Sequence, residues 1–277
     1  MTLQNNDLPI GVFDSGVGGL TVLHAIHELL PCERLLYLGD TARVPYGTKS
    51  PESIVRYAVQ AADFLRGQGI KMLVVACNTA SAVALDELRK RLAPLPVVGV
   101  VEPGARTAVE TGRGGQYLVL ATEATVRLGA YRRAIGAVDA AASIVEQPCE
   151  LMVALAEEGW VEGAIPEAII RRYVGEPLAK MNPAQPRSII LGCTHFPLLR
   201  AAIRRVVGDD VAIVDSASTT ARSVAELLDE LALRRQGDRP KLKLLATDGP
   251  RRFARIGRMF LAEDVAESDI ELVDIQA

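Results

Sequence analysis

Two cysteines follow hydrophobic segments of the same kind in the two halves of the chain. Residues 73–79 read LVVACNT and residues 188–195 read SIILGCTH, so each hydrophobic run ends in a small residue, a cysteine and a polar pair. Cys77 and Cys193 lie nearly half a chain length apart. Either one alone fits an ordinary buried thiol, because cysteine is among the most buried residue types. The repetition favours a functional pair.

A pair of thiols contributed by two halves suits the inversion of an α-carbon. One group removes the proton from one face while another supplies a proton to the opposite face, and the opposite enantiomer needs the roles reversed. Thiols have a pKa of about 8.5, which suits acid–base work near neutral pH, and a helix N-terminus lowers it. We therefore expect one thiol and one thiolate, with Asp14 tuning Cys77 and His195 tuning Cys193.

A glycine-rich segment, DSGVGGLT at residues 14–21, follows the first predicted strand. It departs from nucleotide-binding loops, because the third glycine of a dinucleotide fingerprint falls on Thr21 and the lysine of a phosphate loop is missing. A tight turn without a ligand is one alternative. We favour a small anion held by backbone N–H groups at the helix N-terminus, with Asp14 and Ser15 pointing into the site.

Short β-branched runs alternate with helical patterns along the chain, which predicts an α/β fold with mainly parallel sheets covered by helices. The predicted strands are 9–14, 35–38, 71–76, 97–101, 117–121, 188–191, 212–214 and 242–246. One predicted helix begins at Ser50 and Pro51. The other predicted helices are 19–30, 79–92, 124–136, 149–159, 166–180, 197–207, 218–235 and 250–262. Ligands of open α/β sheets bind at the carboxyl ends of the strands. The loop 41–47 is either a plain connection or part of that edge, with Tyr46 reaching the cleft.

The composition narrows the class of protein. The chain has 277 residues, 49% of them hydrophobic, and a net charge of −3, which argues against nucleic acid or anionic lipid as a partner. We interpret the pair Arg251 and Arg252 as a solvated helix face. The N-terminus lacks a signal-peptide pattern and the apolar stretch 72–85 is too short for a membrane helix. We expect a cytoplasmic protein with reduced thiols.

Six segments together closely resemble glutamate racemase, a cofactor-independent enzyme that makes D-glutamate for bacterial peptidoglycan. They are IGVFDSGVGGLTVL (10–23), YLGDTARVPYGTKS (37–50), VVACNTASA (74–82), VVEPGA (100–105), LGCTHFPLL (191–199) and VDSA (214–217). The resemblance implies two pseudo-symmetric α/β domains with the active-site cleft between them. The first would comprise residues 1–98 and 211–277 with Cys77, and the second residues 99–210 with Cys193.

The resemblance also implies roles for individual residues. Cys77 takes the proton from D-glutamate and Cys193 from L-glutamate, and Asp14 and His195 support them. The implied substrate contacts are Asp14, Ser15, Tyr46, Gly47, Asn78, Thr79, Thr122, Thr194 and His195. Glu157 matches a carboxylate near the cleft. The sequence departs from the usual pattern at Ala121, Leu128 and Ala154.

Other interpretations remain open. A related two-cysteine racemase acting on aspartate or another amino acid is the alternative to glutamate racemisation. A thiol redox enzyme lacks its Cys-x-x-Cys motif, and a non-catalytic amino-acid-binding protein leaves the duplicated thiols without a purpose. We expect no metal and no cofactor, and the resemblance implies a homodimer.

Overall fold

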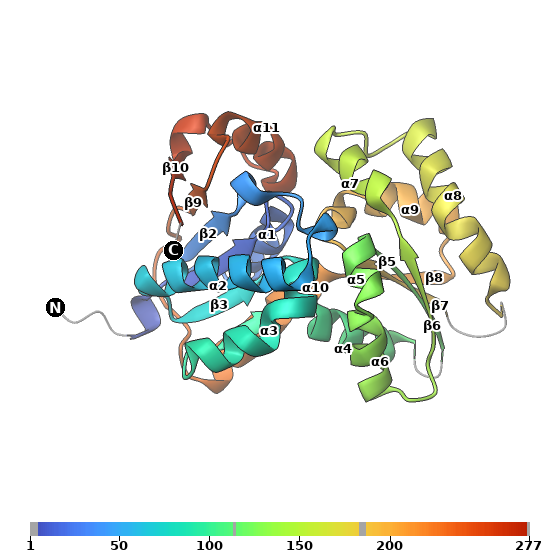
Figure 1. Cartoon of the computed structure of the whole chain (residues 1–277), viewed down its shortest axis with the longest axis horizontal. Coiled ribbons are helices and arrows are strands. Elements are labelled where there is room, and N and C mark those ends of the chain that lie inside the picture. The colour runs from blue at the N-terminus through green and yellow to red at the C-terminus, as the bar shows by residue number, and fades with distance from the viewer. Residues whose placement is uncertain (1–4, 113–114, 183–186, 276–277) are drawn as a thin grey trace.

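Runs rich in Val, Ile and Leu form the strands of two parallel sheets, one in each of two α/β domains (Figure 1). The computed structural model describes residues 5–112, 115–182 and 187–275. The six-stranded sheet has the order β10 (Ile270–Leu272), β9 (Lys243–Ala246), β2 (Leu35–Gly39), β1 (Ile10–Asp14), β3 (Met72–Val75) and β4 (Val97–Gly99). The four-stranded sheet has the order β6 (Ser143–Pro148), β5 (Gln116–Ala121), β7 (Arg187–Gly192) and β8 (Val211–Asp215). The predicted fold class is confirmed.

Helices cover both faces of each sheet (Figure 1). The first domain has α1 (Leu20–Leu29), α2 (Pro51–Gly67), α3 (Asn78–Leu92), α10 (Ser216–Glu230) and α11 (Pro250–Leu261). The second has α5 (Glu123–Arg127), α6 (Ala130–Val138), α7 (Glu150–Glu157), α8 (Ala164–Lys180) and α9 (Arg200–Val207), and α4 (Val101–Thr111) packs on both the second sheet and α10. None of the helices in the described ranges combines the length and apolar character needed to cross a membrane.

The buried cores follow from the alternation of side chains along each strand. In β1, Val12 packs with α1, α10 and α11 on one face, whereas Phe13 packs with α2 and α3 on the other. In β5, Leu118 faces α7, α8 and α9, and Val119 faces α4 and α6. Strands covered on both faces must be apolar throughout, which is why the sequence shows continuous hydrophobic runs rather than alternation.

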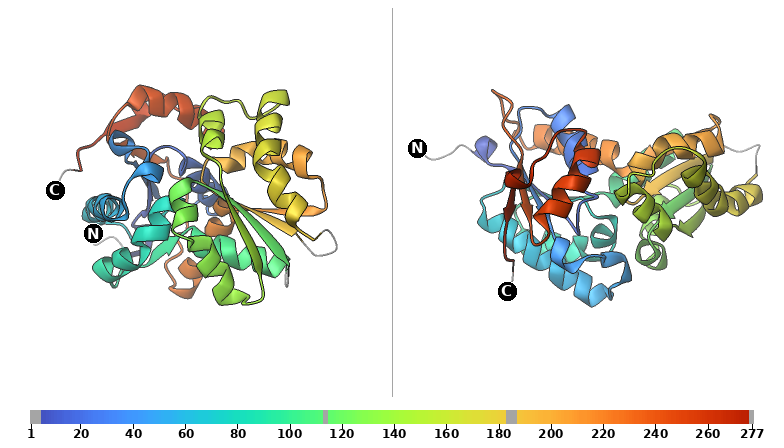
Figure 2. Two further views of the ribbon diagram at one scale, coloured as in Figure 1. Left: turned by 45° about the vertical axis from the view of Figure 1, so that its right-hand side comes forward. Right: turned by 90° about the horizontal axis from the view of Figure 1, so that it is seen from above.

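Several elements differ from the sequence prediction. The structure adds β6, β10 and α4, and it divides the predicted helix 124–136 into α5 and α6. That division lies at Gly129, whose φ of 59° is the left-handed conformation that ends a helix. The domain boundary expected at residue 211 would assign β8 to the first domain, but β8 pairs with β7 in the second sheet. The chain returns to the first domain through α10, which packs against α1 (Figure 2).

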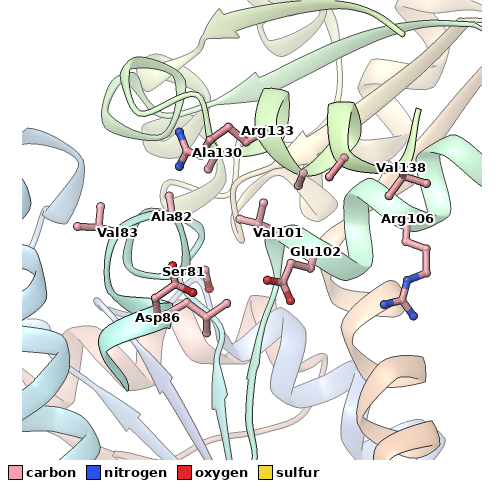
Figure 3. Close-up of a pocket in the computed structure, with 13 residues that line it drawn as sticks. Ser81, Ala82, Val83, Asp86, Val101, Glu102, Arg106, Ala130, Arg133 and Val138 are labelled. Carbon is pink, nitrogen blue, oxygen red and sulfur yellow. The ribbon is translucent and has the colours of Figure 1, made fainter. Parts of the chain in front are cut away.

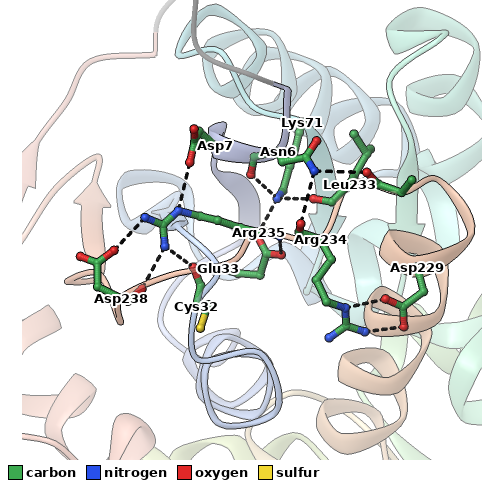
Figure 4. A network of polar contacts seen from close by, with 11 residues as sticks. Asn6, Asp7, Cys32, Glu33, Lys71, Asp229, Leu233, Arg234, Arg235 and Asp238 are labelled. Atoms are coloured by element: carbon green, nitrogen blue, oxygen red, sulfur yellow. Dashed lines mark hydrogen bonds and ion pairs between the residues drawn. The ribbon is translucent and has the colours of Figure 1, made fainter.

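A buried ion pair joins segments of the first domain that are distant in sequence (Figure 4). Lys71 Nζ lies 2.6 Å from Glu33 Oε2 and donates to the carbonyls of Asn6 at 2.8 Å and Leu233 at 2.7 Å. The other oxygen of Glu33 accepts the backbone N–H of Arg235 at 2.8 Å. Burial lowers the pKa of Lys71, and Glu33 opposes that shift. The pair therefore fastens the N-terminal segment and the chain after α10 to the start of β3.

We expect Lys71→Met to lower the free energy of unfolding by about 3–5 kcal/mol, because it leaves the Glu33 carboxylate buried and unpaired. Both side chains of the pair are only 1% exposed. The control is Lys180→Met, which removes an exposed pair with Glu176 and should change the free energy by less than about 1 kcal/mol. Urea unfolding measures both variants. Equal effects of the two substitutions would contradict the prediction.

Candidate active site

A cavity of about 440 Å³ lies where the carboxyl ends of the two sheets meet. In the first sheet, Ser15 directly follows β1 and Cys77 lies two residues beyond the end of the neighbouring strand β3. In the second sheet, Thr122 directly follows β5 and Cys193 directly follows the neighbouring strand β7. The predicted residues that line the cavity are Ser15, Tyr46, Gly47, Cys77, Asn78, Thr79, Thr122, Cys193, Thr194 and His195. Both thiols thus border one space, with one contributed by each domain.

Glu157, which the resemblance placed near the cleft, also lines the cavity. Other residues line it although the sequence did not single them out as site residues. They are Gly16, Val17, Val44, Pro45, Thr48, Glu150, Val153 and Arg252, together with Ala154, noted for its departure from the family pattern. Of the other two cysteines in the chain, Cys149 is buried and Cys32 is partly exposed, and neither lines the cavity.

Cys77 caps the N-terminus of α3. Its Sγ accepts the backbone N–H of Ala80 at 3.4 Å and lies 3.4 Å from Ser15 Oγ. Asn78 and Thr79 are the first two residues of the helix. Burial raises the pKa of Cys77 to about 12, the Asp14 carboxylate adds to the rise, and Ser15 and Ala80 oppose it. The N–H of Ala80 at the helix N-terminus thus lowers the pKa as expected, but burial and Asp14 outweigh it, and the net shift favours the thiol.

Cys193 has a different environment despite the similar sequence. It is followed by Thr194 and His195 and then by the short 3-10 helix η4 (Phe196–Leu199) rather than by an α-helix. Its Sγ lies 3.7 Å from Nδ1 of His195. The other ring nitrogen, Nε2, lies 3.1 Å from Glu157 Oε1. The second thiol thus faces a cationic group, whereas the first lies beside an anionic one.

His195 is buried between an acidic residue and a thiol. Burial alone would lower the pKa of His195, but its hydrogen bonds with Cys193 and Glu157 outweigh burial and raise the pKa to about 10. A protonated ring donates from both nitrogens, so it satisfies Glu157 and Cys193 together. The interaction with His195 also lowers the pKa of Glu157, against the effect of burial.

Arg252 of α11 contacts Glu157 from the other domain, with Nη2 2.5 Å from Oε2. The interpretation of Arg252 as part of a solvated face is therefore incomplete, because the side chain is 58% exposed but also paired and lines the cavity. The same helix contributes Phe260, whose ring meets that of His195 edge-on at 5.3 Å between centroids. Glu157 and Arg252 are 95 positions apart, and nothing in the local sequence signals their contact.

Asp14 lies behind the cavity rather than in its lining. It is 1% exposed, and Oδ2 accepts the backbone N–H of Gly16 at 2.8 Å. Burial raises the pKa of Asp14, while His195 and nearby backbone N–H groups act in the opposite direction. Its other oxygen, Oδ1, has no hydrogen-bond partner within the described part of the chain. Ser15 lines the cavity, whereas Asp14 lies next to the lining, and its role toward the substrate stays a prediction.

The glycine-rich loop serves close packing between the domains. A Cβ on Gly18 would lie 2.3 Å from Thr194 Oγ1 and 2.5 Å from His195 Nδ1, so only glycine leaves room for these residues. Next to this contact, Thr21 Oγ1 donates to the carbonyl of Thr194 at 2.9 Å. Gly18 therefore brings the end of β7 against the first domain.

Three hydroxyl groups connect the domains on the other side of Cys77. Thr79 Oγ1 lies 3.1 Å from Thr122 Oγ1 and 3.3 Å from Thr125 Oγ1, and the latter two are 3.1 Å apart. Each hydroxyl can donate or accept, so the cluster can rearrange to bind a carboxylate or an ammonium group.

Hydrogen bonds to Asp40 hold the loop that carries Tyr46 and Gly47 in place. Asp40 is fully buried and accepts hydrogen bonds from the Tyr46 hydroxyl, from Arg43 Nε at 2.7 Å and from Thr247 Oγ1 at 3.1 Å. The hydroxyl of Tyr46 is therefore occupied, and the residue borders the cavity as part of the wall.

A second cavity of similar volume, about 450 Å³, lies between α3, α4 and α6 (Figure 3). Its charged residues are Asp86, Glu102, Arg106 and Arg133. None of the predicted site residues lines it, and it contains no thiol. The cavity between the two cysteines is therefore the candidate active site.

Comparisons with known proteins agree with the resemblance seen in the sequence. Residues 10–224 match the family described as Asp/Glu/Hydantoin racemase. The chain is 46% identical over 270 residues to a glutamate racemase of Geobacter metallireducens, covering 97% of each. A solved glutamate racemase from Francisella tularensis in complex with D-glutamate is 34% identical, with a TM-score of 0.89 and 98% of each chain covered. One from Thermus thermophilus in complex with β-chloro-D-alanine is 41% identical, with a TM-score of 0.86 and the same coverage.

We expect His195 to titrate near pH 10 rather than near its ordinary value of 6.5. The stabilisation from its raised pKa is fully present below pH 6.5 and is lost as the pH rises through about 10. The chain has only three histidines, so ring resonances can be followed individually by NMR. Glu157→Gln should lower the titration midpoint of His195 and leave that of His27 unchanged, because Glu157 does not act on His27. A wild-type midpoint near 6.5 would refute the Cys193–His195–Glu157 interaction.

Proposed function

The chain belongs to the Asp/Glu/Hydantoin racemase family, and we propose that it interconverts L- and D-glutamate without a cofactor, using two thiols. The observation that carries the proposal is that Cys77 and Cys193, from different domains, line one cavity. Their surroundings differ. Cys77 is buried beside Asp14, which favours the thiol, whereas Cys193 Sγ lies beside the imidazole of His195.

In this mechanism Cys193 Sγ takes the α-proton of L-glutamate, and Cys77 donates its own proton to the opposite face of the α-carbon. The products are D-glutamate, a Cys193 thiol and a Cys77 thiolate. D-Glutamate then reacts in the reverse sense, with Cys77 as the base. Burial and Asp14 disfavour the Cys77 thiolate, so Cys77 begins the cycle as the proton donor.

Unpartnered polar atoms near the thiols support an amino-acid substrate. Asn78 Nδ2 and Asp14 Oδ1 are both buried and have no hydrogen-bond partner within the described residues. The first is a donor suited to a carboxylate, and the second is an acceptor suited to an ammonium group or to a proton shared with its neighbours. A buried polar group without a partner is costly. A bound zwitterion would therefore remove this penalty.

The hydroxyls of Ser15, Thr79, Thr122 and Thr194 supply further hydrogen bonds around the substrate. We assign His195 to hold the charge of Cys193, and Glu157 to hold His195. We assign Tyr46 and Gly47 to the wall that covers the substrate. We further propose that the D-glutamate supplies peptidoglycan synthesis, and that the enzyme acts in the cytoplasm as a homodimer, both on the resemblance alone.

The proposal predicts racemisation in D₂O without added cofactor. L-Glutamate should lose optical rotation and gain α-deuterium, whereas L-aspartate should not react. Exchange with aspartate alone would favour the alternative substrate, and no exchange with either would refute a racemase. Polarimetry and mass spectrometry give the two readouts.

The two-base mechanism predicts that Cys77→Ala and Cys193→Ala each abolish racemisation, because each removes one acid–base group. Cys32→Ser is the control, since Cys32 lies outside the cavity; its rate should match that of the unaltered protein. A near-normal rate in either alanine variant would contradict the mechanism.

A further inference from the structure

Tyr131 of α6 contacts residues next to both thiols of the candidate site. Its hydroxyl is 2.7 Å from Oδ1 of Asn78, the residue after Cys77. Its ring packs on Gly192, the residue before Cys193, where a Cβ would come within 2.8 Å of the ring. Tyr131 is fully buried and does not line the cavity. One side chain of the second domain therefore contacts a neighbour of each thiol from outside the substrate space.

The Tyr131 hydroxyl is the donor in its bond with Asn78. Burial raises the pKa of Tyr131, with contributions from Cys193 and Asp215, so the phenol keeps its proton. Within the described residues Asn78 Oδ1 is its one hydrogen-bond partner. A reversed amide would leave the phenol proton without an acceptor, which is unfavourable at a buried position.

The direction of this bond determines which end of the Asn78 amide faces away from Tyr131. A side-chain amide has an acceptor at one end and two donors at the other. With Oδ1 held by Tyr131, the donor end, Nδ2, is left buried and unpartnered in a residue that lines the cavity. The two N–H bonds of Nδ2 are thus available to an acceptor.

We propose that Tyr131 is a positioning residue that fixes the Asn78 amide with its N–H groups toward the substrate, where they bind a carboxylate. A freely rotating amide would present its oxygen part of the time, and an oxygen repels a carboxylate. Tyr131 thereby selects for an anionic group beside Cys77 without touching it. The carboxylate ligand rests on the proposed function, whereas the orientation of the amide does not.

Tyr131→Phe removes the hydroxyl and keeps the ring on Gly192. We expect KM for glutamate to rise about tenfold, the upper range for one neutral hydrogen bond, with kcat changed less than about twofold, because ground-state and transition-state binding are weakened alike. Tyr117→Phe is the matched control. Tyr117 is equally buried and donates to the Gly112 carbonyl at 2.6 Å, away from the site. The KM of the Tyr117→Phe variant for glutamate should be unchanged.

A double-mutant cycle separates positioning from general loosening of the structure. In the Asn78→Ala background, Tyr131→Phe should change KM by less than about twofold, because the amide that it positions is absent. A merely structural role would raise KM by the same factor in both backgrounds. That result, or an unchanged KM in Tyr131→Phe alone, would overturn the proposal.

A second readout is independent of catalysis. The chain has four asparagines, so ¹⁵N-asparagine labelling gives few side-chain amide signals. Tyr131→Phe should shift the Asn78 side-chain resonances in the ligand-free protein, and Tyr117→Phe should not; an unshifted Asn78 signal would overturn the Tyr131–Asn78 bond. If the unaltered protein exchanges no α-hydrogen of glutamate, the proposed function fails, and this measurement still decides the orientation of the amide.

Discussion

The absence of a side chain at Gly18 is the constraint on which the site depends. His195 and Thr194 occupy the space that a Cβ would need, so the end of β7 lies directly against the β1–α1 loop of the first domain. Each domain by itself offers one thiol at the edge of a sheet. This close approach places Cys77 and Cys193 at the same cavity, beside the contacts of Thr79 with Thr122 and of Tyr131 with Asn78. A Cβ at position 18 would displace Thr194 and His195, the two residues that follow Cys193.

The two half-sites are alike in sequence and opposite in electrostatics. Cys77 is buried with a carboxyl group beside it and its pKa is raised, whereas Cys193 lies beside an imidazole whose own pKa is raised by Cys193 and Glu157. This difference suits the proposed reaction, which needs one acid and one base. It comes from Asp14 beside Cys77 and from His195, held by Glu157, beside Cys193.

The sequence predicted what depends on local pattern and missed what depends on tertiary contact. The central strands are buried on both faces, so their apolar runs identified them. The edge strand β6 has half-buried side chains and the sequence SIVEQP, which gives neither a continuous run nor a clean alternation. Helix α4 begins VEPG, and a proline and a glycine look like a loop although a first turn accommodates proline. In the site, the position of each thiol after a strand was predictable. The raised pKa of Cys77, the burial of Asp14 behind the lining and the contact of Arg252 with Glu157 were not, because each depends on how the two domains meet.

The contacts between the domains differ in their exposure to water. The buried contacts contribute more free energy than the exposed ones. The Arg252–Glu157 pair joins side chains that are 58% and 21% exposed, and ion pairs with exposed members contribute about 0–1 kcal/mol. The Tyr131–Asn78 bond is buried, and breaking one partner of a buried bond costs about 1–3 kcal/mol because the other is left without water or protein. The contacts that hold the geometry are thus the ones behind the thiols, away from solvent. The exposed pair instead holds Glu157, the residue whose other oxygen contacts His195.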